Sequence, residues 1–197
     1  MFKRVLISLS LVLMMPIAAD AALFGDDSSP CISAAGTTYE TAFSNSVSMA
    51  PLVIQEIASA KKSIRVSARH FNSKAVSIAL VQATRAGKDL KIVLDEKLNN
   101  NDYSSAAFLR SMSMPPHVLK NHDNMYLDYM VIDENDIVLG NIAGLNDAEA
   151  EKKNPSSVLV IHNAPELAKQ YLTNWKAMWD SSEEMKRAKS GGLHDEM

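Results

Sequence analysis

The sequence predicts a single-domain α/β fold, and two patterns carry that prediction. Residues 63–70 alternate apolar and polar side chains, residues 73–86 follow a helical pattern, and residues 88–95 contain a dense aliphatic run. A strand, a helix and a strand in this order are typical of parallel strands joined by a right-handed crossover. Two further apolar stretches, 126–132 and 137–142, are separated by four polar residues and predict a hairpin.

Length and composition are those of an ordinary globular protein. The chain has 197 residues, of which 47% are hydrophobic and 22% charged. That is enough apolar material for one core. The formal net charge is −3, so no overall positive field favours binding to nucleic acid.

The first 21 residues have the pattern of a cleavable signal peptide of bacterial type. Lys3 and Arg4 precede an apolar run over 5–15, and Ala19-Asp20-Ala21 offers a cleavage site. As a helix the run would reach only ~16 Å, about half of the hydrocarbon core, which disfavours an uncleaved anchor. We expect a periplasmic or secreted protein with no integral membrane segment after cleavage.

A linker and the first helix should follow the signal peptide. Residues 22–42 are rich in turn formers and are expected to be a flexible linker. Apolar residues at helical spacing predict a helix over 49–61. Cys31 is the only cysteine and cannot form an internal disulfide, which leaves a buried thiol or a link to a second chain.

The helix of the crossover should begin after Ser73 as N-cap and end at Gly87. A short helix over 103–112 and a weak strand over 117–120 are expected next.

The last elements should be a strand over 157–162 and a long helix that opens at Ala164-Pro165-Glu166. The buried stripe predicted for this helix comprises Leu167, Ala168, Tyr171, Leu172, Trp175, Met178 and Trp179. Residues 183–197 are charged and then glycine-rich and are expected to be a disordered tail, which bounds the domain at 43–182.

Several short stretches, in this order and spacing, resemble a known family. They are Ile57 to Arg65, Arg85 to Glu96, Val131-Ile132-Asp133, and the helix with Asn174-Trp175 and Met178-Trp179. Together they resemble the phospholipase D superfamily and, within it, the small secreted Nuc-type endonucleases, over roughly residues 43 to 181. The resemblance implies a phospholipase D-like mixed sheet flanked by helices.

Active members of that family carry a His-x-Lys-x-x-x-x-Asp motif, followed by a strand with Gly-Ser or Gly-Thr and a nearby Asn. Two motifs meet at a two-fold axis in the family, where one histidine attacks phosphorus, the other protonates the leaving oxygen and the lysines hold phosphate, with no metal or other cofactor. In this sequence Asp133 fits the Asp position, but Asp128 stands at the Lys position and Tyr126 at the His position. The motif is therefore degenerate.

The following strand departs from the pattern too. Gly140 fits the glycine, but Asn141 replaces Ser or Thr, and Ala143 stands where Asn is expected. A phenol, with an ordinary pKa near ~10, is a poor substitute for an imidazole near ~6.5. A carboxylate at the Lys position reverses an attraction to phosphate of ~1 kcal/mol in water, or ~4 kcal/mol near a protein surface.

Other histidines are candidate substitutes. His122 lies four residues before Tyr126, and His70 ends the strand that borders the cleft in the family. The alternative for His122 is an exposed polar loop residue. Its neighbours Asp123 and Asp128 leave open a cation-dependent site, although the spacing matches no familiar ligand set. His162 and His194 have the positions of ordinary polar residues, and Asp133 has the structural alternative of starting its hairpin loop.

The leading functional hypothesis is a secreted phospholipase D-like domain that has lost phosphodiesterase activity and acts as a binding or assembly module, with an envelope protein as partner. The alternative is an active phosphodiesterase or endonuclease that uses Tyr126 or a relocated His70 or His122, with nucleic acid or phospholipid as substrate. The resemblance also implies a homodimer around the strand pair 126–142, where Val131, Ile137, Val138 and Leu139 are expected to offer apolar surface.

Overall fold

The computed structural model describes residues 33–44, 49–99, 104–120, 122, 125–142 and 153–186. The expected signal peptide 1–21, Cys31, Asp123 and Ala143 lie outside these residues.

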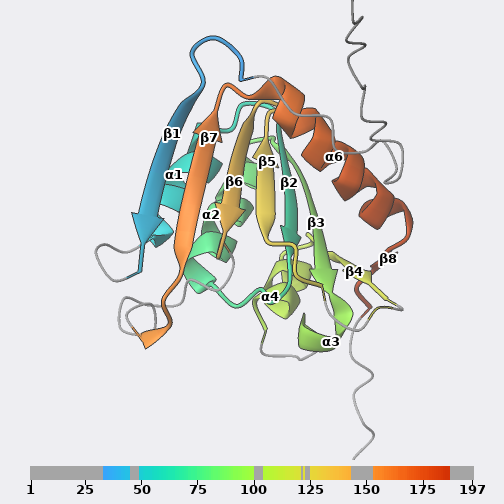
Figure 1. The fold of residues 1–197 in the computed structure, drawn as a ribbon. Helices are drawn as coiled ribbons and strands as arrows, with labels where there is room; N and C mark the ends of the chain where they lie inside the picture. Colours follow the sequence, from blue (N-terminus) through green and yellow to red (C-terminus); the bar gives the residue numbers. More distant parts are fainter. Residues whose placement is uncertain are drawn as a thin grey trace, which may run out of the picture. The chain divides into compact units, whose positions relative to one another are not determined.

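Eight strands of the described chain form one sheet in the order β1-β7-β6-β5-β2-β3-β4-β8, drawn in Figure 1. The pairs β2–β3 and β3–β4 are parallel and the other neighbours are antiparallel, so the sheet is mixed as predicted. The strands are β1 Thr38–Phe43, β2 Ser63–Ala68, β3 Asp89–Asp95, β4 His117–Leu119, β5 Tyr129–Ile132, β6 Asp136–Gly140, β7 Ser157–His162 and β8 Glu183–Glu184.

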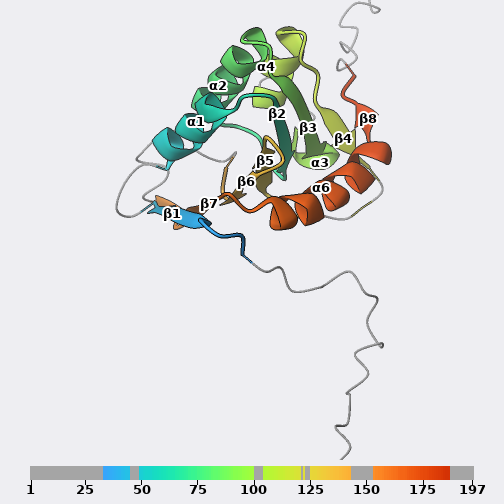
Figure 2. The ribbon, with the colours of Figure 1, turned by 90° about the horizontal axis from the view of Figure 1, so that it is seen from above.

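Helices cover both faces of the sheet, as Figure 2 shows: α1, α2 and α4 lie on one face and α6 on the other. Each face has its own apolar cluster, so the central strands are buried on both sides. The helices are α1 Ala50–Ser59, α2 Lys74–Arg85, α3 Glu96–Asn99, α4 Ser105–Ser111 and α6 Pro165–Asp180.

The predicted crossover is confirmed in detail. The Ser73 hydroxyl accepts the Val76 N–H at 3.3 Å and caps α2. The helix ends before Gly87, whose φ of 85° suits glycine. β2 and β3 then pair in parallel, with Ser63 opposite Asp89.

The long helix also packs as predicted. The expected stripe on α6 is buried or half-buried against one face of the sheet. Trp175 is 5% exposed, and its Nε1–H donates to the Val66 carbonyl at 2.9 Å. The indole therefore fastens α6 to the central strand β2.

Two boundaries differ from the prediction. The expected linker 22–42 contains most of β1, which begins at Thr38 and pairs with β7 along its whole length. The expected tail 183–197 begins with β8, which pairs with β4, and the following Met185 is 5% exposed. Both segments are ordered by pairing with a distant strand, which local composition does not reveal.

The apolar residues expected to form a dimer contact are buried or partly buried within one chain. Val131, Ile137 and Val138 are at most 1% exposed, and Leu139 is partly buried. The reason is that helices cover both faces of the sheet, so an apolar strand here belongs to the core of one chain.

No helix among the described residues is long and apolar enough to cross a membrane.

Candidate functional site

An open groove of about 630 Å³ lies where β5 begins and β6 ends, at the lower end of these strands in Figure 1. Tyr126, Asp128, Gly140 and Asn141 all border it, so the structure brings four of the motif positions together. The lining residues are Tyr126, Leu127, Asp128, Tyr129, Leu139, Gly140, Asn141, Asn154, Pro155, Ser156 and Tyr171.

Asp128 is tied to the end of the neighbouring strand. Because β5 runs antiparallel to β2, the residue before Tyr129 faces the chain that leaves β2. The Asp128 Oδ1 atom accepts the Arg69 N–H at 2.7 Å. Burial raises the pKa of Asp128, against the opposing effect of this hydrogen bond and of positive charge on Arg69 and His70. The charges of Arg69 and His70 therefore both act on the Asp128 carboxylate.

Tyr126 is 72% exposed at the rim of the groove. The Arg69 guanidinium carbon lies 4.9 Å from the centre of the Tyr126 ring, a cation–π contact that contributes ~0.5–1 kcal/mol at exposed sites. The Arg69 Nε is buried and has no hydrogen-bond partner within the described part of the chain. Arg69 thus brings a cation to the site. Sequence reasoning missed this residue because only the pairing of β2 with β5 brings it close to Tyr126 and Asp128.

Gly140 is required at its position for a steric reason. Its φ is 102°, and a Cβ there would lie 2.2 Å from the Ser157 carbonyl oxygen, so only glycine allows β6 and β7 to approach so closely. The next residue, Asn141, donates its side-chain amide to the Ser156 hydroxyl at 3.3 Å.

Asp133 lies at the other end of β5 from Asp128, so the structure does not place it in the groove. Its carboxylate accepts the N–H groups of Lys61, Lys62 and Ser63 at 2.7, 2.7 and 2.9 Å. Burial alone would raise the pKa of Asp133, but these hydrogen bonds outweigh burial and lower it. Asp133 therefore fixes the connection between α1 and β2.

His122 is held by a buried carboxylate that sequence reasoning did not single out. Its Nε2 lies 3.2 Å from the Oδ2 of Asp95, which is 1% exposed, and its Nδ1 lies 3.3 Å from the Lys120 carbonyl. Burial acts to raise the pKa of Asp95, but hydrogen bonds from the Met125 N–H, from His122 and from two further N–H groups outweigh it and lower the pKa. Both imidazole nitrogens of His122 thus have partners.

Asn99 extends this network. Its side chain accepts the Phe71 N–H at 2.8 Å and donates to the Arg69 and Asp95 carbonyls at 2.8 and 2.7 Å. The network fixes the ends of β2 and β3 beside the groove. His70 lies between Arg69 and Phe71, the two residues whose backbone Asn99 holds, and its side chain is exposed.

The chemistry available at the groove follows from these positions. The groove offers the Tyr126 phenol and the half-buried Asp128 carboxylate, which motif spacing assigns to the His and Lys positions, and the charges of Arg69 and the exposed His70 act on that carboxylate. A guanidinium can bind an anion, and an imidazole can act as nucleophile or proton carrier at neutral pH.

Comparison with known proteins agrees with the fold. The family profile described as "Cardiolipin synthase, PLD-like domain" matches residues 53–179. A protein named Phospholipase D from Rickettsia bellii is 28% identical over 123 residues, which are 62% of this chain and 60% of that protein. The chain therefore spans less than two thirds of the length of this relative.

Solved structures are similar as well. The phospholipase D family member Nuc from Salmonella typhimurium has a TM-score of 0.68 and 28% identity, covering 77% of this chain and 99% of that one. NucT from Helicobacter pylori has a TM-score of 0.61 at 18% identity, covering 75% of this chain and 100% of that one. The second likeness is one of fold.

Proposed function

Because this chain belongs to the phospholipase D-like domain family, we propose that it is an exported member that has lost the family's phosphodiesterase centre and serves as a binding or assembly module. The observation that carries this proposal is the carboxylate of Asp128 at the groove, at the position that motif spacing assigns to the family's lysine. A phosphate ~4 Å away would be repelled by ~1 kcal/mol in water and by ~4 kcal/mol near a protein surface.

Tyr126 supports the same proposal. Its ring packs under the Arg69 guanidinium, and a phenol of ordinary pKa is protonated at neutral pH and is therefore a weak nucleophile. The open groove offers a binding surface but has no imidazole among its described lining residues.

A second function is favoured by one specific observation. His70 has an exposed side chain, and its charge acts on Asp128, while the buried Arg69 Nε has no partner among the described residues. In an active phosphodiesterase, Arg69 would take the role of the lysine and His70 that of the histidine. Tyr126 as nucleophile, or His122 released from Asp95, are the other catalytic candidates.

Metal-free hydrolysis separates the two functions. The full chain is assayed with a chromogenic phosphodiester, single-stranded DNA and phospholipid vesicles, each with EDTA, and we expect no turnover. Turnover that is lost in His70→Ala would establish the second function, whereas loss only in Tyr126→Phe would make the phenol the nucleophile. Turnover that requires added divalent cation would contradict both.

A charge reversal tests the role of Asp128 directly. Tyr126→His combined with Asp128→Lys should create binding of phosphate or sulfate, measured by calorimetry. Glu134→Lys makes the same change of charge in the hairpin after β5, and we expect no binding from it because it lies at the opposite end of that strand. Equal binding by both variants would show an effect of net charge alone.

Export and assembly belong to the same proposal. Intact mass of the envelope-fraction protein should correspond to cleavage after Ala21, and a membrane-bound species that still begins at Met1 would contradict export. We propose a homodimer in which the exposed Tyr126 and Leu127, 72% and 40% accessible, contribute to the contact. Light scattering over a concentration series should give twice the monomer mass, and a monomer throughout would exclude a shared groove.

A further inference from the structure

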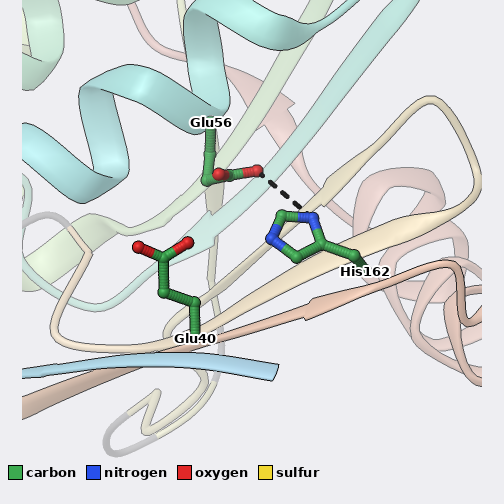
Figure 3. A group of neighbouring side chains, drawn as sticks. All are labelled: Glu40, Glu56 and His162. Carbon is green, nitrogen blue, oxygen red and sulfur yellow. Dashed lines mark ion pairs between the residues drawn. The ribbon is translucent and has the colours of Figure 1, made fainter. Parts of the chain in front are cut away.

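Three side chains that can coordinate a metal meet at the β1–β7 side of the sheet. Glu40 comes from β1, Glu56 from α1 and His162 from the last position of β7, and Figure 3 shows their ligand atoms turned toward one another. One ligand atom from each lies within 4.8 Å of the others.

The fold dictates this meeting. Thr38 pairs with His162 in the β1–β7 ladder, so Glu40, two residues further along β1, points to the same face of the sheet as His162. Glu56 lies on the buried side of α1, among Leu52, Val53 and Ile57.

Glu56 is the unusual member of the group. Its side chain is 3% exposed, and its Oε2 is buried without a hydrogen-bond partner in the described part of the chain. The His162 Nδ1 is 3.8 Å away, beyond hydrogen-bond distance. A buried carboxylate oxygen without a hydrogen bond is costly, and the ion pair with His162 compensates its charge only in part.

Two neighbouring carboxylates increase the cost of burying the Glu56 charge, and one imidazole reduces it. Burial raises the pKa of Glu56, the positive charge of His162 opposes this effect, and the negative charges of Asp136 and Glu40 add to it. The Asp136 Oδ2 lies 3.7 Å from the His162 Nδ1, while its Oδ1 already accepts from Asn135 and Asn163. The carboxylates of Glu40, Glu56 and Asp136 thus all lie near the His162 imidazole.

We propose that Glu40, Glu56 and His162 bind a divalent first-row transition-metal cation, with Zn²⁺ as the type case. One imidazole and two carboxylates are a donor set suited to this class of ion. Tetrahedral ligand bonds of ~2.0–2.2 Å around a zinc ion place ligand atoms roughly 3.3–3.6 Å apart. The 3.8 Å between Glu56 and His162 needs only a small closure, and separations of up to 4.8 Å within the group need roughly 1 Å more, which the exposed Glu40 side chain can supply.

The exposure of the three side chains fits an open site. Glu40 is exposed and His162 half-buried, whereas Glu56 is buried, so an ion can enter from solvent and keep a water as its fourth ligand.

The cation would join three elements rather than serve the groove. His162 ends β7, whereas the groove meets the residue just before β7 begins, and the six residues of that strand span roughly 20 Å. A metal bound here would fasten β1 to β7 and α1. The site is independent of the function proposed for the groove, and its test does not depend on any activity.

Calorimetry with zinc chloride on the full, untagged, EDTA-treated chain tests the proposal. We expect one ion per chain and a rise in melting temperature with zinc. Glu56→Gln keeps the size of the side chain and removes its charge, so it should fold and should weaken binding by more than roughly 100-fold, the upper end of what loss of an outer-shell partner costs. Glu134→Gln, an exposed carboxylate outside the cluster, is the matched control and should bind as wild type does.

A Co²⁺ absorption spectrum provides the second readout. Cobalt bound by the wild-type chain should show d–d bands of a low-coordinate N/O site, and these bands should be absent from Glu56→Gln. Failure of the wild-type chain to bind zinc, or equal binding by wild type and Glu56→Gln, would overturn the proposal.

Discussion

Asp133→Asn should destabilise the fold by about 2–3 kcal/mol, because this carboxylate organises the backbone between α1 and β2. One oxygen accepts from Lys62 and Ser63 and the other from Lys61. Asparagine keeps the first oxygen as a neutral acceptor but sets its NH₂ group against the Lys61 N–H. Hydrogen bonds to charged groups contribute ~1.5–3 kcal/mol and neutral ones ~1 kcal/mol. Because two of the three bonds are exposed, the low end applies, and the loss of one bond with the weakening of two gives about 2.5 kcal/mol.

Urea and thermal unfolding followed by circular dichroism measure this loss. At ~2–4 °C per kcal/mol for a domain of this size, the melting temperature should fall by roughly 4–12 °C. Glu134→Asn is the matched control, since φ is 59° at Glu134 and 53° at Asp133. Asparagine tolerates this region, and Glu134 is exposed, so the control should stay within about 0.5 kcal/mol of wild type.

The pH dependence provides a further check on Asp133. Hydrogen bonds hold the pKa of Asp133 below its ordinary value of 3.8, so its stabilising effect is complete above that pH and is lost as pH falls through the lowered pKa. The difference between wild type and Asp133→Asn should therefore be constant near neutral pH and shrink only in strong acid. A variant as stable as the control, or a difference that is insensitive to acid, would refute the reasoning.

Three further outcomes are expected from unfolding experiments. Gly140→Ala should lower the free energy of unfolding by about 2–5 kcal/mol, because a positive φ costs ~1–2 kcal/mol and the clash with a β7 carbonyl adds ~1–3 kcal/mol. Gly87 has a positive φ but open space around it, so Gly87→Ala should cost only the ~1–2 kcal/mol of the backbone conformation. Equal losses in the two variants would exclude the clash. Asp128→Asn should stabilise the chain at pH 7, because burial disfavours the charged carboxylate and raises the pKa of Asp128. As pH falls through this raised pKa toward 3.8, the wild-type carboxyl is protonated and the stability difference between wild type and variant should shrink. A stability gain that is independent of pH would contradict the explanation. Trp175→Phe should lower the free energy of unfolding by about 1–3 kcal/mol, because the buried hydrogen bond from the indole to the Val66 carbonyl is lost. A neutral effect would show that this hydrogen bond contributes nothing.

The crossover and the long helix could be predicted from sequence because each carries a strong local signal. Ser73 caps α2 and Gly87 follows its end, so the helix is bounded by its own residues. In α6 the apolar stripe faces the sheet wherever that sheet lies. Local patterns of this kind do not depend on which strands become neighbours.

β1 was not predictable because its sequence lacks the pattern of a core strand. Only Ala42 of its six residues is buried, so no alternation of apolar residues marks it. Its order comes from pairing with β7, whose position in the sheet is a property of the whole fold.

The same limit applies to the candidate site. Tyr126, Asp128 and Gly140 could be placed by motif spacing, and they do border one groove. Arg69 and Asp95 could not, because their partners come from strands and loops far along the chain. For Glu56 a signal was present in the sequence: a carboxylate three and four residues from Val53 and Leu52, inside an apolar helical stripe.

The position of β1 has a consequence for how the chain folds. Thr38 pairs with His162, so β1, which precedes the other described strands, can pair only after nearly the whole domain has been synthesised. Pairings between such distant residues form late and slowly. Until then β7, with Val158, Val160 and Ile161, presents a bare apolar edge that can pair with the same strand of another chain. Truncation before Phe43 would leave this edge of β7 exposed permanently, and we expect such a chain to aggregate more readily than the full chain.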